Sequence, residues 1–337
     1  MTNLFDKVVV FSDIHLGLKN NSREHNVDCV NFVEWMIKEA HDRGVKTCIF
    51  GGDWHHSRST INVSTLNYST NLFRQLDDAF DDVYFIVGNH DLFYKEKREI
   101  SSIDFGKDHP NFHLINEPTV IGNVGLIPWV VGEEWNDITK MQVKYMFGHF
   151  EFPRFLVNAN YEMPDHGKYV QGDLSHVDLV FSGHFHKRQR RGNIQYVGNC
   201  FPHSFSDVDE EQDRGIMFLE WGAKKPEFKM WPGTPRYRYR TLSHVVENID
   251  EIEPKTFLRA TLDVEADFED VSFVRETVGA LKNMKEFTLL PRKRELIEAV
   301  DDPEEFESVD ATVISNLQQI ESKMFDSNFL IQIYSEL

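Results

Sequence analysis

Five short polar motifs in this chain each follow an apolar run that is typical of a buried β-strand. Side chains that follow strands in this way gather at the carboxyl ends of a sheet, where loops meet. We therefore expect their Asp, His and Asn groups to converge, in numbers that suit two metal ions sharing one carboxylate. The motifs are Asp13-Ile14-His15, Gly52-Asp53, Gly88-Asn89-His90-Asp91, Gly148-His149 and Gly183-His184-Phe185-His186.

The first third of the chain alternates strands with helices. Apolar runs at 7–11, 46–50 and 83–87 are separated by amphipathic helical patterns at 26–40 and 64–80. Such alternation predicts a mostly parallel sheet covered on both faces. From about residue 112 shorter connections predict a second sheet facing the first, and hence an α/β fold with a β-sandwich of two mixed sheets flanked by helices. Its strands are expected at 112–114, 119–121, 126–131, 144–147, 177–181, 194–197 and 216–221.

The length of 337 residues suits one large domain with an appendage, or two domains. We place the main domain at 1–235. A strand, helix, strand pattern predicts a small α/β subdomain at 236–300. Six of the ten residues at 301–310 are acidic, which is typical of a solvated linker, and apolar spacing beyond it predicts a helix-loop-helix up to residue 337.

The composition limits the environment and the partners. A net charge of -19 argues against a protein that coats nucleic acid through its overall charge. It does not exclude local binding of nucleic acid through a small basic patch. Three scattered cysteines indicate neither a disulfide framework nor a structural zinc site. We find no signal-type segment at the start and no apolar stretch that could span a bilayer. We expect a cytoplasmic protein of a prokaryote or a phage-infected cell, with no membrane contact.

The ligand types narrow the choice of metal. Oxygen and imidazole donors without thiolate favour Mn²⁺, Mg²⁺, Fe or Zn²⁺. Two such ions, ~3.5–4 Å apart, suit in-line attack at phosphorus. Asp-x-His and Gly-Asp alone are common in ordinary loops, whereas Gly-Asn-His-Asp and Gly-His-x-His after a strand are fairly specific. The ordered set of five is the strongest signal. Histidines outside the set, such as His25, are expected at the surface or as helix caps.

This ordered set resembles the calcineurin-like metallophosphoesterases and, within them, the SbcD/Mre-eleven nucleases. The resemblance covers about residues 7–235 and extends to Ile127-Pro128-Trp129 and Asp213-Arg214-Gly215. It implies two Mn²⁺ ions, with Mg²⁺ as the alternative. It implies one ion on Asp13, His15, Asp53 and His186, and the other on Asp53, Asn89, His149 and His184, so that Asp53 bridges.

The resemblance also implies three catalytic positions. His90 would protonate the leaving 3′ oxygen as a general acid, Asp91 would orient His90, and His56 would shape substrate approach. The loop Asn199-Cys200-Phe201-Pro202 departs from relatives that place Ser or Thr and then Pro nearer the glycine.

Two features of the sequence indicate the class of substrate. Phosphoprotein phosphatases carry Val-Asp-Arg-Gly after Gly-Asp, and Glu where this chain has Asp91; here Trp54-His55-His56 follows Asp53, which favours the nuclease branch. A basic cluster directly after the last ligand pair is either a solvated turn or a DNA-backbone contact. Its residues are Lys187, Arg188, Arg190 and Arg191, with Arg236, Arg238, Arg240, Arg292, Lys293 and Arg294 as weaker candidates.

We therefore expect a two-metal, manganese-dependent DNA exonuclease and endonuclease subunit acting at breaks in recombination and repair. The resemblance implies an SbcC/Rad-fifty-type ABC ATPase partner, docked on the C-terminal helices, and a homodimer through residues 64–100. Two alternatives stay open. One is a small-molecule or cyclic-nucleotide phosphodiesterase or phosphatase, and the other is a non-catalytic scaffold on a relic metal site.

Overall fold

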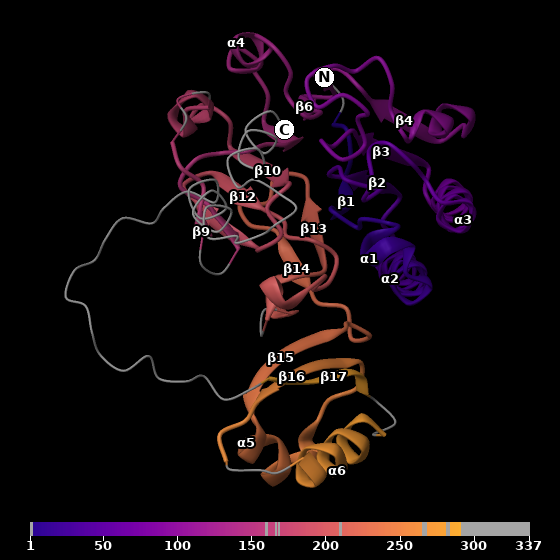
Figure 1. Ribbon diagram of the computed structural model, residues 1–337. Helices are drawn as coiled ribbons and strands as arrows, with labels where there is room; N and C mark the ends of the chain where they lie inside the picture. Colours follow the sequence, from indigo (N-terminus) through magenta and orange to yellow (C-terminus); the bar gives the residue numbers. More distant parts are fainter. Residues whose placement is uncertain are drawn as a thin grey trace, which may run out of the picture. The chain divides into compact units, whose positions relative to one another are not determined.

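Two six-stranded sheets pack face to face in the computed structural model (Figure 1), which describes residues 3–158, 161–165, 167, 169–208, 211–264, 268–280 and 284–290. The first sheet has the order β14-β13-β1-β2-β3-β4. Its strands β1 to β4 are parallel, and β13 and β14 add an antiparallel edge. The bounds are β1 (Lys7–Phe11), β2 (Thr47–Phe50), β3 (Asp82–Ile86), β4 (Phe112–Ile115), β13 (Ile216–Glu220) and β14 (Glu227–Lys229).

The second sheet has the order β11-β12-β10-β7-β6-β5, with a parallel centre and antiparallel edge strands. The predicted fold class, a mixed α/β sandwich, is confirmed. The bounds are β5 (Thr119–Ile121), β6 (Val124–Ile127), β7 (Tyr145–His149), β10 (Leu179–Gly183), β11 (Gln189–Arg191) and β12 (Ile194–Tyr196), and β8 (Leu156–Asn158) pairs with β9 (Tyr161–Glu162) as a separate hairpin.

The prediction was wrong for two strands. β4 and β13 were expected in the second sheet, but they extend the first one on either side of β1–β3. The chain returns to the first sheet at β13 because the antiparallel pairing with β1 covers the edge that β1 would otherwise expose.

The side chains of β1 show how the layers are held. Val8 and Val10 belong to the core between the two sheets, together with Phe147 and Phe181 from the second sheet. Their neighbours Val9 and Phe11 point to the other face, because successive side chains in a strand alternate. On that face they pack under the helices α2 (Arg23–Asp42) and α3 (Val63–Ala79), which cover the outside of the first sheet (Figure 1).

The outer face of the second sheet has a different cover. The core there is completed by loop aromatics such as Phe150, Phe152 and Phe155, and by Ile138 of the short helix α4 (Trp135–Ile138). Among the helices that the structure describes, none is long and apolar enough to cross a membrane.

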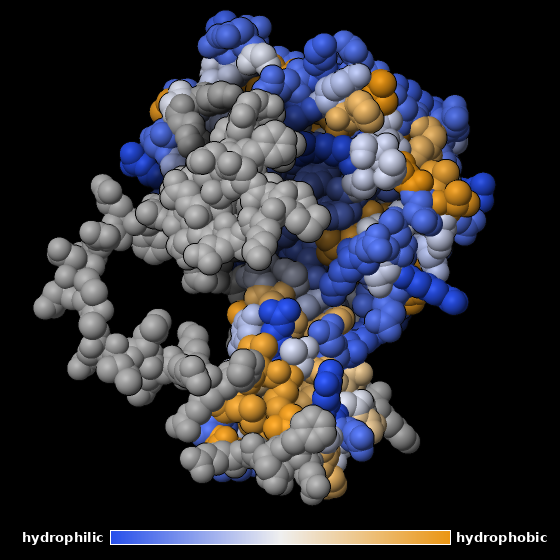
Figure 2. Space-filling model, viewed as in Figure 1, coloured by the Kyte–Doolittle hydropathy of each residue, from blue (hydrophilic) through white to orange (hydrophobic). Residues whose placement is uncertain are grey.

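A third, all-parallel sheet follows the sandwich. It has the order β15-β16-β17, with β15 (Arg236–Thr241), β16 (Thr256–Thr261) and β17 (Met284–Leu290). Parallel neighbours need crossover connections, and α5 (Leu242–Glu247) and α6 (Phe268–Gly279) lie in these connections. Figure 2 shows hydrophobic residues gathered on this part of the surface, and Phe273 on α6 is 69% exposed. The predictions for residues 291–337, including Arg292, Lys293 and Arg294, lie outside the described residues.

Candidate metal centre

The five motifs meet at one end of the two facing sheets. Asp13 and His15 follow β1, Asp53 follows β2, and Asn89 and His90 follow β3. His149 closes β7 in the second sheet, and the His184–His186 pair follows β10. Two groups of three side chains each bring one ligand atom per residue within 4.8 Å of one another. They are Asp13, His15 and His186, and Asp53, His149 and His184.

The backbone at this end is strained. Four of these residues adopt left-handed φ angles, at 54° for Asp13, 49° for His15, 63° for Asp53 and 85° for His184. Each such residue costs about 1–3 kcal/mol, and strain of this kind concentrates at functional sites. The loops hold one another in this shape, because Asp13 N–H donates to the Gly52 carbonyl at 2.9 Å and His15 N–H donates to the Asp53 carbonyl at 3.2 Å.

Two glycines permit the close approach of the loops. A Cβ on Gly88 would lie 2.3 Å from both the backbone nitrogen and the Oδ1 of Asp53. A Cβ on Gly52 would lie 2.4 Å from His149 Nδ1. Real side chains do not pack at such distances, so these positions demand glycine for space.

Asp91 organises the Asp53 loop. Its Oδ2 accepts from the N–H groups of Gly88 and Asp53, each at 2.9 Å, and its Oδ1 accepts from Trp54 N–H at 2.9 Å and His55 N–H at 3.2 Å. The predicted role of orienting His90 is therefore wrong, because backbone donors occupy both carboxylate oxygens. Asp91 is a positioning residue for the loop that carries Asp53.

Three acceptor atoms face one another around His149. Its Nδ1 lies 2.7 Å from the Gly51 carbonyl and must carry the hydrogen, so Nε2 is the acceptor nitrogen of the neutral ring. Nε2 in turn lies 2.9 Å from Asn89 Oδ1 and 3.4 Å from Asp53 Oδ2. Burial alone would lower the pKa of His149, but the Asp53 carboxylate outweighs it and raises that pKa to about 9. A cation, either a proton or a metal ion, is needed between these atoms.

The group of Asp13, His15 and His186 also favours a bound cation. Burial raises the pKa of Asp13 to about 7, and the neighbouring Asp53 carboxylate acts in the same direction. His15 is 3% exposed, yet neither of its ring nitrogens has a hydrogen-bond partner among the described residues. Buried charges and polar groups in proteins are paired or coordinate metals. The donor set therefore fits two divalent cations of the kind that take oxygen and imidazole ligands.

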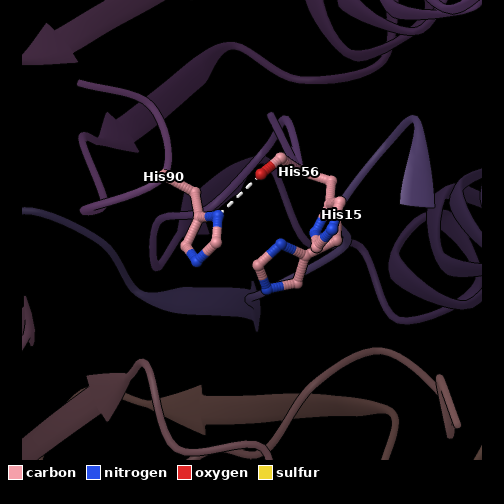
Figure 3. A group of neighbouring side chains, drawn as sticks. All are labelled: His15, His56 and His90. Carbon is pink, nitrogen blue, oxygen red and sulfur yellow. Dashed lines mark hydrogen bonds between the residues drawn. The ribbon is translucent and has the colours of Figure 1, made fainter. Parts of the chain in front are cut away.

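His90 lies beside both groups. Its backbone N–H donates to Asp53 Oδ1 at 2.7 Å, and its Nδ1–H donates to the backbone carbonyl of His56 at 2.6 Å. Figure 3 shows this bond and the rings of His15, His56 and His90 gathered around one space. The ring of His56 stacks on that of His90 with centroids 5.6 Å apart. Because Nδ1 is occupied, His90 offers Nε2 for proton transfer.

Comparison with known proteins agrees with this geometry. The profile of the calcineurin-like phosphoesterases matches residues 6–188, more than half of the chain. The chain belongs to the calcineurin-like phosphoesterases. Members of this family are hydrolases that depend on two metal ions, which accounts for the paired ligand groups.

Individual relatives of this phosphoesterase are distant. Exonuclease subunit 1 of Enterobacteria phage T4 is 28% identical over 232 residues, which is 66% of this chain and 67% of that protein. A protein of Invertebrate iridescent virus 6 named as a phosphoesterase is 24% identical over 246 residues, or 67% of this chain and 79% of that one. Among solved structures, a dimetal phosphatase from Danio rerio is 11% identical, with a TM-score of 0.41, and the match covers 64% of this chain and 92% of that one.

The phosphoesterase site opens into a cavity of about 350 Å³. Sequence reasoning missed several of its wall residues, among them Lys19, Ser204 and Ser206, because they lie outside the motifs. It also missed His203, which is 4% exposed and has no hydrogen-bond partner for either ring nitrogen in the described part of the chain. The remaining lining residues are His15, Leu18, Asp53, His56, His90, His184 and His186.

His25 corrects another expectation. It was expected at the surface or as a helix cap, but it is 6% exposed, and its Nε2 lies 3.0 Å from the His15 carbonyl. The predicted helix began at residue 26, whereas α2 begins at Arg23. His25 was therefore left out of the predicted helix, and its place on the buried side of the first turn was not recognised.

The basic cluster of this phosphoesterase divides in two. Arg188 donates to the carbonyls of Val197, Gln212 and Arg214, and its guanidinium lies 4.0 Å from the centre of the Phe228 ring. These contacts tie Arg188 into the fold, and its contact with DNA stays a prediction. Arg190 and Arg191 are exposed on β11. The weaker candidates Arg236 and Arg238 form ion pairs with Glu253.

Proposed function

We propose that this chain is a DNA nuclease subunit that uses two Mn²⁺ ions to hydrolyse phosphodiester bonds, as an exonuclease and an endonuclease, at DNA breaks. The placement of His90 supports this proposal most. A phosphodiester has a poor alkoxide leaving group that gains from a proton, and His90 lies in the wall of the cavity with Nε2 available. The similarity to a phage T4 protein named as an exonuclease subunit also supports it.

The proposed site residues are of two kinds, the metal ligands and the general acid His90. Asp13, His15, Asp53 and His186 would hold one ion, and Asp53, Asn89, His149 and His184 the other. When bound, two such cations supply Lewis-acid activation of the attacking water and offset charge on the phosphate. His90 Nε2–H would donate to the leaving 3′ oxygen, and the His56 carbonyl keeps the ring in the required tautomer and orientation.

The test compares substrates. We would incubate the purified chain with linear duplex DNA, single-stranded DNA and a p-nitrophenyl phosphodiester, with Mn²⁺, Mg²⁺ or EDTA. DNA degradation that requires Mn²⁺ supports the nuclease. Cleavage of the small diester with intact DNA, both without and with a partner ATPase, would favour the small-molecule phosphodiesterase instead. The absence of metal-dependent turnover on every substrate would favour the scaffold.

DNA contact is proposed for three residues of the basic cluster, of which Arg190 and Arg191 are exposed. Lys187, Arg190 and Arg191 follow the last ligand pair, and phosphate contacts of this kind are sequence-independent and sensitive to salt. Charge reversal at Lys187 and Arg190 together should weaken DNA binding and flatten its dependence on salt. Lys46→Glu is the control, because Lys46 precedes β2 at the opposite end of the strand from Asp53. Equal binding by both variants would contradict the contact.

The partner proposal concerns the C-terminal residues. We assign 1–235 to the nuclease domain, 236–300 to a cap and 301–337 to an acidic linker and a helix-loop-helix that docks an SbcC/Rad-fifty-type ATPase. Deleting residues 305–337 should abolish co-purification with that ATPase and leave the metal-dependent cleavage of the isolated chain intact. Retained pairing would contradict this assignment.

A homodimer through residues 64–100 is part of the same proposal. Exposed apolar side chains in and beside this region support it, with Val63 82%, Tyr94 44% and Ile100 51% exposed. Light scattering on the purified chain should give twice the mass of one chain, and Ile100→Glu should shift it towards the monomer. A monomer at all concentrations would contradict the dimer.

A further inference from the structure

A third group of potential ligands overlaps the two groups described above. His15, His56 and His90 each offer one imidazole nitrogen, and these three nitrogens lie within 4.8 Å of one another. Figure 3 shows the three rings reaching the same space from three different loops. His56 and His90 belong to neither proposed ion, so the two ligand sets do not include this third group.

Each of these three histidines has a ring nitrogen whose lone pair can bind a metal. The carbonyl of His56 can only accept a hydrogen bond, so His90 carries its hydrogen on Nδ1 and its lone pair on Nε2. Metal-ligating histidines are commonly fixed in this way by a backbone carbonyl on the other nitrogen. His56 Nδ1 is buried without a hydrogen-bond partner among the described residues, and so are both nitrogens of His15.

The chemistry of this group differs from that of the two proposed ions. Those ions take carboxylate or amide oxygen with imidazole, which suits Mn²⁺ and Mg²⁺. Three imidazoles with an open fourth position suit Zn²⁺. Asp53 lies nearby as a counter-charge, with its Oδ2 3.7 Å from His15 Nε2.

We propose that His15, His56 and His90 form a third metal site that binds Zn²⁺. Its occupancy excludes His15 from the Asp13 group and takes the lone pair of His90 that must carry the proton. Zn²⁺ at this site is therefore an inhibitor of the Mn²⁺-loaded enzyme. The binding rests on the side chains alone, whereas the inhibition rests on the function proposed above.

The binding is tested without turnover. The background is the full chain with Asp13→Asn and Asp53→Asn, which removes the carboxylates of both other groups while keeping side-chain volume. We expect one tightly bound Zn²⁺ in competition with a chromogenic chelator. Adding His56→Ala should weaken it at least about tenfold, and His56→Asn should do the same. The His56 carbonyl that holds His90 is backbone and remains in both variants.

His113→Ala in the same background is the matched control. His113 lies on β4, and its Nε2 is bonded to Asp82 at 2.8 Å. Zn²⁺ affinity that is unchanged by both His56 variants, or lost equally in the control, would overturn the site. Circular dichroism confirms that each variant is folded.

The inhibition is tested on otherwise wild-type protein loaded with Mn²⁺. Each protein is compared with its own rate without Zn²⁺, on the p-nitrophenyl diester and on DNA. We expect the Zn²⁺ concentration for half inhibition to rise at least about tenfold in His56→Ala. An unchanged value would overturn the inhibitory role. A protein without any turnover would contradict the proposed function, and the binding experiment would still decide the zinc site.

Discussion

His90 Nδ1 lies 2.6 Å from the backbone carbonyl oxygen of His56, while its own backbone N–H is bonded to Asp53 Oδ1 at 2.7 Å. His90 is thus fixed at both ends by the loop after β2, its ring by the His56 carbonyl and its backbone by the Asp53 carboxylate. The imidazole is held in one tautomer beside the candidate metal ligands without being part of either proposed ligand set.

Replacing His90 should affect substrates according to their leaving groups. His90→Ala should slow DNA cleavage by about 10²–10⁴-fold, the usual contribution of a general acid. A p-nitrophenolate leaves without protonation, so hydrolysis of that diester should fall far less. Rates on the two substrates, measured at saturating Mn²⁺, give the comparison. Equal losses on both would contradict the role of proton donor.

Asp91 should matter for the shape of the Asp53 loop. Asp91→Asn puts an NH₂ group where one oxygen accepts two backbone N–H bonds, and each bond to a charged group is worth about 1.5–3 kcal/mol. We expect a loss of at least that size in urea unfolding, together with weaker Mn²⁺ binding. Asp82→Asn is the control, because Asp82 is half-exposed and bonded to His113. An unperturbed Mn²⁺ affinity in Asp91→Asn would contradict the positioning role.

Gly88 should be irreplaceable for reasons of space. In Gly88→Ala the new methyl group would collide with Asp53, so Mn²⁺ binding should be lost even though every proposed ligand remains. Gly172→Ala is the matched control, since no atom lies within 4 Å of its Cβ position. Calorimetric titration of Mn²⁺ into both variants checks this. Tight binding by Gly88→Ala would show that the loop can relax.

The protonation of His149 should make the metal-free chain sensitive to pH. Its folded pKa is about 9, above the usual 6.5, so the stability it contributes is complete below pH 6.5 and is lost as the pH rises to 9. In EDTA, the free energy of unfolding should fall between pH 7.5 and 9 by up to about 1.4 kcal/mol per pH unit. His149→Asn should flatten this slope, and an equal slope in that variant would refute the assignment.

Much of the fold follows from local patterns in the sequence. β1 and β5 have the predicted bounds, and α2 and α3 differ from the predicted helices by a few residues at the ends. Sheet membership was harder to predict, because β4 and β13 have the same apolar pattern as their neighbours in sequence. Which edge a strand joins depends on tertiary pairing, which strand periodicity does not encode.

The site shows a similar division. The order of the motifs at strand ends was enough to bring Asp13, His15, Asp53, His149 and His184 together. The hydrogen bonds that support the proposed ligands were not predictable from the sequence. Asp91 was predicted to orient its neighbour His90, but its carboxylate accepts hydrogen bonds from the backbone of the loop after β2. Arg188 was assigned by its charge, and only the structure shows the three carbonyls that it binds.

The number of Mn²⁺ ions bound per chain tests the central claim most directly. Elemental analysis after dialysis against Mn²⁺ should give two ions for the wild-type chain. Because Asp53 is the proposed bridge, Asp53→Ala should reduce the count to below one, whereas Asp82→Ala should leave it at two. Two ions retained without Asp53, or a single ion in the wild-type chain, would contradict the two-metal account.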